Sequence, residues 1–327
     1  MDLISLDDIS RAADVLAGVA VRTPLLPAPW AAGAAGPVAE RGELWVKPES
    51  LQPVGAFKIR GAYFAVASLP AGRRAAGVIA HSSGNHAQAV AYAARAFGIP
   101  CVVVMPDVAA PTKIAATEAL GARVVLVEPD RRETVTHELA EAEGYAIIPP
   151  YDHPDVIAGQ GTVGLEIVAD LPIVDVVLVP VGGGGLASGV ATAVKALRPS
   201  ATVIGVEPEL AADAQESLRE GRLVTWSAER TYRTVADGLR TPTSELTLAH
   251  LAARLDGIIT VTEDEILDTV GLLARSARLV VEPSGAVSVA GYLHHRAELP
   301  PGRTVAVVSG GNIDPATLAR LIAPATA

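Results

Sequence analysis

The sequence has little of what would point to a redox, nucleic-acid or membrane function. It contains one cysteine, Cys101, which excludes an intrachain disulfide, a cysteine-cluster zinc site and a C-x-x-C motif. No run of Lys or Arg exceeds two residues and the net charge is −10, so binding to nucleic acid or an anionic membrane is not expected. A phosphate-bearing small molecule remains possible, because backbone N–H groups bind phosphate without a basic patch. The length of 327 residues, half of them apolar, excludes disorder and predicts about two domains.

The sequence also shows no signal expected of a targeting segment or of a membrane-spanning helix. The N-terminal segment has early acidic residues and no basic region followed by an apolar core, so we expect no signal peptide. The long uncharged stretch at 176–194 contains Pro180 and four successive glycines, which a lipid-exposed helix does not favour. A buried strand, a glycine loop and a helix explain this stretch better. With the single cysteine, these features predict a soluble cytoplasmic protein.

Apolar runs rich in β-branched residues alternate with Ala-rich segments of helical spacing. Eight runs predict strands, which begin at Leu44, Gly77, Cys101, Arg123, Val176, Thr202, Gly257 and Thr304. Segments 85–98 and 263–280 predict helices, Ser5 and Asp8 predict a capping box, and Pro111 fits a first helical turn. Continuous apolar strands separated by helices are typical of parallel sheets covered on both faces, so the fold class is α/β. We predict a large domain of residues 1–76 plus 151–327 and a small mobile domain of residues 77–150.

Two segments in the first half carry residue types suited to chemistry. In KPESLQPVGAFKIRGA, from Lys47, Lys58 follows turn residues and Phe57 at a predicted helix start. Alone, this pattern favours a surface lysine over a desolvated amine that forms a Schiff base. In HSSGNHAQ, from His81, two hydroxyls, an amide and an imidazole gather where a strand ends and a helix begins. These groups either cap the helix or, with its first N–H groups, bind a carboxylate.

Two segments in the second half also follow apolar strands. Gly182–Gly185 precede a predicted helix, and four successive glycines allow a backbone nest for phosphate, whereas a tight turn needs only one or two. This run does not match G-x-x-x-x-G-K-[ST] or G-x-G-x-x-G. Ser309, in VSGGN from Val308, is placed either to hydrogen-bond a ring nitrogen or to cap the next helix.

In this order, the four segments resemble the fold type II pyridoxal-phosphate enzymes, in particular the serine/threonine dehydratase and serine racemase branch. The resemblance covers nearly the whole chain, including QGTVGLEI from Gln160, VADGLRT from Val235 and VVEPSGA from Val280. It implies two domains with parallel-rich sheets, a cofactor in the cleft between them, and a homodimer. Ala56 stands where the family usually has Ser, and Ala87 where Gly is frequent, departures that we expect to bear on loop conformation and substrate preference.

The resemblance also implies a role for each site residue. Lys58 would bind pyridoxal 5'-phosphate as a Schiff base and act as the base on the substrate Cα, with Ser83 on the opposite face. Asn85 would bind the cofactor's 3-hydroxyl oxygen and Ser309 its pyridine nitrogen. The other implied cofactor contacts are Phe57, Gly182, Gly183, Gly184, Gly185, Leu186, Gly238 and Glu282. The substrate carboxylate would be bound by Ser82, Ser83, Asn85 and His86.

The resemblance further implies a cation site and raises the question of a nucleotide site. Glu207, Ala211 and Asp213 match the spacing of a structural cation site in serine racemase-like members, where two carboxylates and a carbonyl suit Mg²⁺, Mn²⁺ or Ca²⁺. Without the resemblance, this segment is an acidic loop before a helix. Lys113 matches a nucleotide-contacting lysine, but Leu120 replaces a stacking Tyr, so we expect weak or absent activation by ATP.

Three interpretations of function remain open. The first is a lyase that removes the Cα proton and the Cβ hydroxyl of a 3-hydroxy amino acid, giving a 2-oxo acid and ammonia. The second is an amino-acid racemase with elimination as a side activity, which Ser83 and the cation site permit. The third, a binding protein without catalysis, is disfavoured by the intact Lys58 and phosphate loop. Serine, threonine, 3-hydroxyaspartate, phenylserine and hydroxyectoine-breakdown intermediates all fit as substrates.

Overall fold

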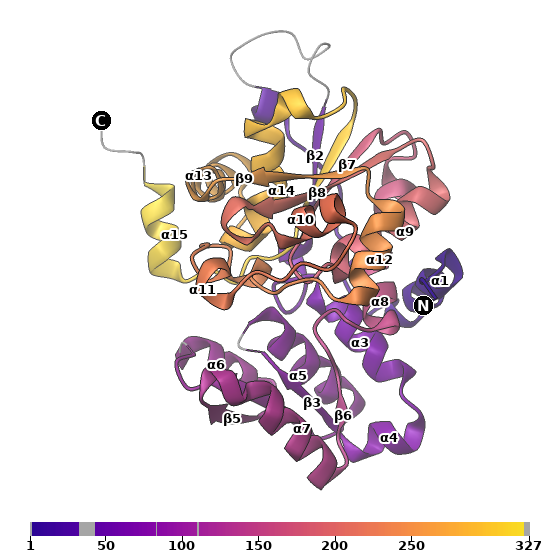
Figure 1. Cartoon of the computed structure of the whole chain (residues 1–327), viewed down its shortest axis with the longest axis vertical. Helices are drawn as coiled ribbons and strands as arrows, with labels where there is room; N and C mark the ends of the chain where they lie inside the picture. Colours follow the sequence, from indigo (N-terminus) through magenta and orange to yellow (C-terminus); the bar gives the residue numbers. More distant parts are fainter. Residues whose placement is uncertain (1, 33–42, 83, 110, 324–327) are drawn as a thin grey trace.

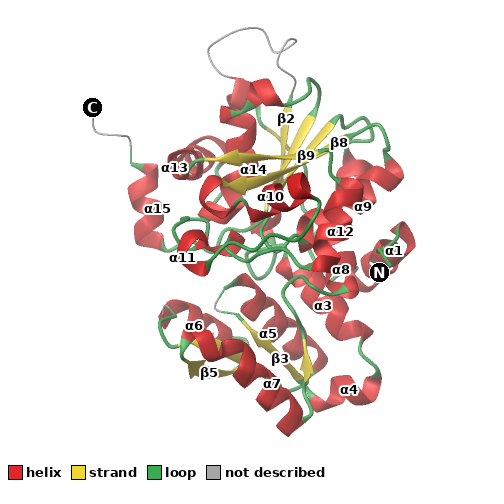
Figure 2. Cartoon of the chain, viewed as in Figure 1, coloured by secondary structure: helices red, strands yellow, loops and turns green. Residues whose placement is uncertain are grey.

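Two parallel-rich sheets covered by helices make up the fold (Figures 1 and 2). This computed structural model describes residues 2–32, 43–82, 84–109 and 111–323. The predicted α/β class with parallel-rich sheets is confirmed, and all eight predicted strands are present. The described residues add two strands, β1 (Leu26–Pro27) and β6 (Ala146–Ile147), which are too short to show an apolar pattern.

The larger sheet has the strand order β1-β2-β10-β7-β8-β9. Its longer strands are β2 (Leu44–Pro48), β7 (Val176–Pro180), β8 (Thr202–Pro208), β9 (Gly257–Val261) and β10 (Thr304–Val308). Neighbours pair in parallel, except β1 with β2. Alternation along β7 turns Leu178 toward α13 (Glu263–Leu272) and α14 (Pro283–His294), and Val177 toward α8 (Pro154–Asp170) and α9 (Gly185–Leu197). Both faces are therefore buried, which is why the strands are apolar throughout.

The smaller sheet has the order β5-β4-β3-β6, with every pair parallel. It contains β3 (Val78–His81), β4 (Cys101–Pro106) and β5 (Arg123–Val127). Helices α3 (Lys58–Ser68) and α5 (Asn85–Phe97) pack on one face and α7 (Arg132–Glu143) packs on the other. As predicted, Pro111 lies in the first turn of α6 (Pro111–Ala119). The domain boundaries near residues 77 and 150 stay a prediction.

The remaining helices cap and connect the two sheets. They are α1 (Leu6–Leu16), α4 (Ala71–Ala76), α10 (Asp213–Glu220), α11 (Ala228–Thr231), α12 (Glu245–Arg254) and α15 (Pro315–Ile322). The capping box of Ser5 and Asp8 at α1 is confirmed. The prediction of one helix over 263–280 is wrong at its end, because a π-helical turn follows α13 and Arg278 adopts a left-handed φ of 61°. None of the described helices is long and apolar enough to cross a membrane.

Candidate active site

Lys58 lies at the start of α3, where the loop after β2 enters the helix. Its Nζ donates a hydrogen bond to the main-chain oxygen of Pro150 at 2.7 Å and lies 5.1 Å from the centroid of the Phe57 ring. Burial lowers the pKa of the Lys58 amine to about 8. The chain has four lysines, and the other three form ion pairs, with Glu166, Asp237 and Asp256. Lys58 is thus a partly buried amine without a carboxylate partner in the described parts of the chain, the state that attack on a carbonyl needs.

The loop before Lys58 pairs with the loop that contains Ser309. The N–H of Phe57 donates to the oxygen of Ser309 at 3.0 Å, and the N–H of Gly311 donates to the oxygen of Gly55 at 2.8 Å. Because β2 and β10 are parallel neighbours, their carboxyl ends lie at the same edge of the sheet. The fold thereby holds the predicted Schiff-base lysine beside the predicted partner of the ring nitrogen.

Ser284 joins two further predicted residues and was missed by the sequence analysis. The Oγ of Ser309 donates to the main-chain oxygen of Ser284 at 3.3 Å, and the N–H of Gly238 donates to Ser284 Oγ at 2.9 Å. Ser284 is buried at the start of α14, two residues after Glu282. Its place in the VVEPSGA segment was the available signal. Gly238 and Ser309 are therefore positioned through a shared residue.

Asn85, the first residue of α5, contacts Glu282, which immediately precedes α14. Asn85 Nδ2 donates to Glu282 Oε1 at 2.6 Å, and Asn85 Oδ1 accepts from Asn312 Nδ2 at 2.7 Å. Burial, and next the charge of Asp237, raises the pKa of Glu282 to about 7, although the hydrogen bond from Asn85 acts in the opposite direction. The sequence analysis quoted Asn312 within its motif but assigned it no role.

The four-glycine loop connects β7 to α9 and packs too closely to its neighbours for any side chain. A Cβ at Gly182 would lie 2.8 Å from Leu239 Cα, and a Cβ at Gly183 would lie 2.5 Å from Cδ1 of Tyr151. Gly184 has a left-handed φ of 85°, and Leu186 is buried in the first turn of α9. Main-chain N–H groups at a helix start form a site for phosphate, so this glycine cradle fits a phosphate group.

Tyr151 packs against this cradle, and the sequence analysis did not identify it either. Its ring packs on Gly183, and a Cβ at Gly185 would lie 2.8 Å from the Cβ of Tyr151. Burial raises the pKa of the Tyr151 hydroxyl to about 12. Tyr151 follows Pro150, whose oxygen accepts from Lys58, so one short segment contacts both the amine and the cradle. No local pattern marks Tyr151, because its contacts depend on tertiary packing.

The substrate-binding candidates are only partly brought together. Ser82 Oγ accepts a hydrogen bond from the N–H of Gly84 at 3.2 Å, and Ser83 lies outside the described residues. His86 Nε2 lies 2.8 Å from the main-chain oxygen of Ile148, and burial lowers the pKa of His86 to about 3. Because a carbonyl only accepts, the neutral ring carries its proton on Nε2, and Nδ1 is an acceptor. His86 in this state anchors Ile148 and has no donor left for a carboxylate.

The predicted cation ligands lie at the end of β8 and the start of α10. Glu207 Oε1 and Oε2 accept from the N–H groups of Ala214 and Gln215 at 3.2 and 2.8 Å, so its carboxylate caps α10. Burial raises the pKa of Glu207 and raises that of Asp213 to about 6. Among the described residues Asp213 Oδ2 has no hydrogen-bond partner although it is buried, and Ala211 is also buried. Two buried carboxylates of this kind fit a hard cation, although the described residues hold no cluster of three acidic, His or Cys side chains.

Lys113, the candidate nucleotide contact, pairs with an acidic residue next to Gly238. Its Nζ lies 2.9 Å from Asp237 Oδ2, which connects α6 of the smaller sheet to the larger one. Leu120 packs against the apolar cluster of α3 and α5. The prediction about ATP is not tested by these contacts and stays a prediction.

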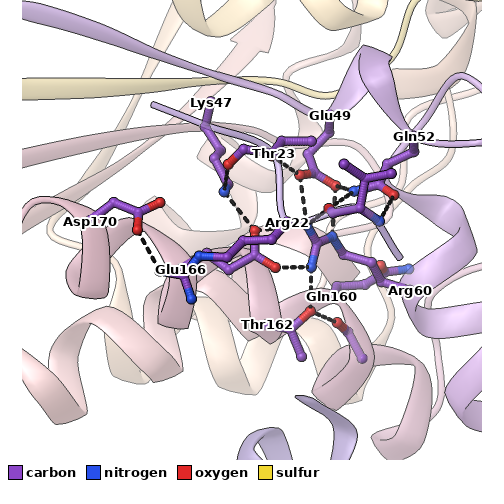
Figure 3. Close-up of polar contacts among 12 residues, drawn as sticks. Arg22, Thr23, Lys47, Glu49, Gln52, Arg60, Gln160, Thr162, Glu166 and Asp170 are labelled. Atoms are coloured by element: carbon purple, nitrogen blue, oxygen red, sulfur yellow. Dashed lines mark hydrogen bonds and ion pairs between the residues drawn. The ribbon is translucent and has the colours of Figure 1, made fainter. Parts of the chain in front are cut away.

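A buried ion-pair network around Arg60 is the largest feature that the sequence analysis missed (Figure 3). Arg60, in the first turn of α3, is 1% exposed and donates from Nε to Glu49 at 2.7 Å and from Nη1 to Glu166 at 2.6 Å. Lys47 Nζ also donates to Glu166 at 2.6 Å. The network ties β2, α3 and α8 together within two residues of Lys58.

Taken together, the desolvated lysine, the glycine cradle and the paired loops are the features expected of an enzyme that binds a phosphate-bearing cofactor through a lysine. Comparison with known sequences agrees: residues 17–310 match the family described as pyridoxal-phosphate dependent enzyme, and the chain belongs to this family. The predicted family is therefore confirmed.

Several characterised relatives are similar along most of the chain. An L-threonine ammonia-lyase of Thermotoga maritima is 42% identical over 98% of this chain and 78% of its own. An L-threo-3-hydroxyaspartate ammonia-lyase of Saccharomyces cerevisiae is 42% identical over 86% of each chain. A serine racemase of Schizosaccharomyces pombe is 39% identical over 94% of each chain.

Solved structures show the same fold. Maize serine racemase superposes with a TM-score of 0.92 at 34% identity, covering 98% of this chain and 97% of that chain. A threonine deaminase of T.th. superposes with a TM-score of 0.89 at 45% identity, covering 95% of this chain and 99% of that chain. The fold type II architecture is thus shared.

Proposed function

We propose that this protein is a pyridoxal-phosphate-dependent ammonia-lyase. It would convert a 3-hydroxy amino acid, such as L-threonine or L-serine, to a 2-oxo acid and ammonia. The observation that carries the proposal is Lys58, a desolvated amine with a pKa of about 8 and no carboxylate partner in the described structure. The names of relatives at 42% identity, an L-threonine and a 3-hydroxyaspartate ammonia-lyase, support this substrate class.

The residues around Lys58 fit the cofactor. The main-chain N–H groups of Gly182 to Gly185 and Leu186, at the start of α9, would hold its phosphate, and a Cβ on Gly182 or Gly183 would displace this loop by colliding with Leu239 or Tyr151. Phe57, Gly238 and Glu282 would surround its ring, Asn85 would donate to its 3-oxygen, and Ser309 would face its ring nitrogen. When bound, pyridoxal phosphate supplies an electron sink that makes loss of the Cα proton possible.

Lys58 would be both the attachment point and the base. Near its pKa of about 8, much of the amine is neutral and can accept the Cα proton at Nζ. The hydrogen bond to the oxygen of Pro150 holds Nζ in position. Because the next residue, Tyr151, packs on the glycine cradle, the amine stays close to the cradle. Ser309 would face the ring nitrogen with a neutral hydroxyl rather than a carboxylate, so that nitrogen would not be kept protonated, which would favour elimination.

The substrate carboxylate would bind at the start of α5. Ser82 and the first N–H groups of α5, including the main-chain N–H of Asn85, offer donors there, and Ser83 is the candidate for the face of Cα opposite Lys58. His86 is better assigned to anchoring Ile148, because its one N–H is already used. The exclusion of nucleic acid and membrane partners remains part of this proposal.

The cation, the domain motion and the assembly complete the proposal. Glu207, Ala211 and Asp213 would bind a structural Mg²⁺, Mn²⁺ or Ca²⁺, since Asp213 Oδ2 is buried without a partner. Residues 77–150 would form a small domain that moves over the cleft. The protein would act as a homodimer in the cytoplasm, which light scattering of the purified protein and cell fractionation would test.

A racemase is the second candidate function. It is favoured by serine racemases of Schizosaccharomyces pombe and maize, which are similar to this chain over at least 94% of its length. A panel of 3-hydroxy amino acids, including threonine, serine, 3-hydroxyaspartate and phenylserine, distinguishes the two. Formation of 2-oxo acid supports the lyase, whereas D-isomer as the main product supports the racemase.

Lys58→Ala should lower turnover at least about a hundredfold while the melting curve stays cooperative, because the base and the attachment point are lost. Lys195→Ala, on α9, is the matched control and should retain activity. Borohydride reduction followed by peptide mapping should place the cofactor on Lys58 among the four lysines. Retention of a tenth of the activity by Lys58→Ala would exclude Lys58 as the base.

A further inference from the structure

The chain has only two asparagines in 327 residues, and they are hydrogen-bonded to each other. Asn312 Nδ2 donates to Asn85 Oδ1 at 2.7 Å and to the main-chain oxygen of Val54 at 2.9 Å. Asn85 Nδ2 then donates to Glu282 Oε1 at 2.6 Å. Asn312 thus donates both to Val54 and to Asn85, and Asn85 donates onward to Glu282.

The direction of these hydrogen bonds is fixed at Val54. A main-chain carbonyl accepts only, so Asn312 must turn its NH₂ toward Val54, and the second hydrogen of that NH₂ serves Asn85. Reversing Asn85 alone would place two NH₂ groups against each other. Reversing both amides would place the Asn312 oxygen against the Val54 oxygen. Each alternative leaves like groups facing each other, which costs free energy for buried polar atoms.

Glu282 cannot fix the direction by itself. Burial raises the pKa of its carboxyl to about 7, so near neutral pH it is partly protonated. A protonated carboxyl can donate to an amide oxygen as well as accept from an amide nitrogen. Asn85 would then be free to turn either way, unless its oxygen is held from the other side by Asn312.

Two glycines leave room for this arrangement. A Cβ at Gly55 would lie 2.5 Å from Asn312 Oδ1. A Cβ at Gly310 would lie 2.2 Å from Glu282 Oε1 and 3.1 Å from Asn85 Nδ2. Gly55 also has a left-handed φ of 72°, which few other residues adopt. The loops around Lys58 and Ser309 therefore leave room for the side chains of Asn312 and Glu282.

We propose that Asn312 is a positioning residue that fixes the amide of Asn85 with its NH₂ available to the cofactor. This inference rests on the proposed function, in which Asn85 donates to the cofactor's 3-oxygen. Asn85 Nδ2 has two hydrogens, and Glu282 uses one of them. The second is available to the cofactor only while Asn312 occupies Oδ1, so Asn312 acts on the cofactor through Asn85.

A double-mutant cycle on cofactor affinity tests this. The dissociation constant of pyridoxal phosphate is measured by absorbance titration for the wild type, Asn85→Ala, Asn312→Ala and the double variant. We expect each single variant to weaken binding about tenfold, the effect of one hydrogen bond, and the double variant to equal Asn85→Ala. Asn312→Asp, which has the same shape but no N–H, should behave as Asn312→Ala.

The outcomes separate this inference from the proposed function. If Asn312→Ala weakens binding by its full factor in the Asn85→Ala background as well, the two residues act independently and the inference is wrong. If Asn85→Ala binds as tightly as the wild type, the assigned role of Asn85 is wrong and the inference falls with it. Melting curves confirm that each variant is folded.

A second measurement does not depend on affinity. Protein labelled with ¹⁵N at asparagine alone shows two side-chain NH₂ pairs, because the chain has two asparagines. In Asn312→Asp only the Asn85 pair remains, and we expect its shifts to move toward those of free asparagine. An unchanged Asn85 pair would overturn the inference even if the alanine variant failed to fold.

Discussion

At the scale of single residues, the site contains titratable groups whose pKa values burial shifts in favour of the neutral form. Burial lowers the pKa of Lys58 to about 8 and that of His86 to about 3, and it raises the pKa of Glu282 to about 7. None of the three forms an ion pair with a described residue. An amine or carboxyl whose pKa lies near neutral pH can take up or release a proton under working conditions, which is why shifted pKa values gather at catalytic sites.

The raised pKa of Glu282 predicts how the stability of the protein depends on pH. Its pKa is about 7 in the folded protein and near 4.5 when unfolded. Between these values the unfolded state has released the proton and the folded state has not, so stability falls as pH rises from 4.5 to 7. Glu282→Gln cannot ionise and should escape this loss. Urea unfolding at several pH values should show the variant gaining stability relative to the wild type across this window.

The control for the lost charge is Glu141→Gln, an exposed position on α7. Its stability relative to the wild type should vary much less with pH over the same range. If Glu282→Gln differs from the wild type by the same free energy at both ends of the window, Glu282 does not hold its proton in the folded protein.

The residues that the sequence analysis found stand in short sequence patterns, whereas those that it missed depend on contacts with residues far along the chain. Lys58 and the four glycines stand in short patterns whose strand, loop and helix context could be predicted. Tyr151 and Asn312 gain their roles from partners far along the chain: Asn312 lies 227 residues from Asn85. Periodicity carries no information about such contacts, and only the tertiary fold reveals them.

At the scale of elements, the start of α3 is held by charges that no pattern would bury. Arg60 stands in a helix, where a lone arginine usually faces water. It is buried here because Glu49 follows β2 and Glu166 lies 106 residues further on α8 (Figure 3). Strands were predictable since their apolar character is local, whereas this network depends on the packing of three elements.

Glu49→Gln should destabilise the protein by about 3–5 kcal/mol, because it leaves buried Arg60 and Lys47 with one carboxylate between them. The matched control is Glu143→Gln, which removes the partner of Arg123 in an exposed ion pair and should leave the melting temperature nearly unchanged. Chemical denaturation measures both. A loss of stability in Glu49→Gln no larger than that in the control would show that the network does not hold α3.

The loop between β7 and α9 gives a second prediction at this scale. In Gly183→Ala, the new Cβ would lie 2.5 Å from the Tyr151 ring, so the ring or the loop must move. We expect weaker binding of pyridoxal phosphate and a lower melting temperature. Gly72→Ala, in α4, adds a methyl group with no atom within 4 Å and should leave both unchanged or slightly raise stability. Equal cofactor affinity in the two variants would contradict the assignment of the cradle.

At the scale of the whole molecule, two sheets meet at one site because their strands point their carboxyl ends toward it. The loops after β2, β7 and β10 come from the larger sheet and Asn85 comes from the smaller one. This arrangement follows from parallel strands, which the sequence predicted. What it could not predict is the contact between the sheets, such as the ion pair of Lys113 with Asp237.

Cation binding is the last prediction, and it concerns the stability of the molecule as a whole. Glu207 and Asp213 are buried carboxylates with raised pKa values, and in the described parts of the chain neither has a basic partner in hydrogen-bond contact. A cation that binds only the folded state stabilises it by about 2.7 kcal/mol at a hundred times its Kd. A chelator should therefore lower the melting temperature, and added Mg²⁺ or Mn²⁺ should restore it.

The variant Asp213→Asn distinguishes a site that binds a cation from a site that binds none. If a cation binds, the variant loses a ligand, melts lower in Mg²⁺ than the wild type and responds little to chelator. If none binds, removing a buried charge whose Oδ2 has no partner should raise stability instead, since the desolvation cost disappears. Melting curves of both proteins with chelator and with Mg²⁺ decide between the two, because the sign of the change in Mg²⁺ is opposite in the two cases.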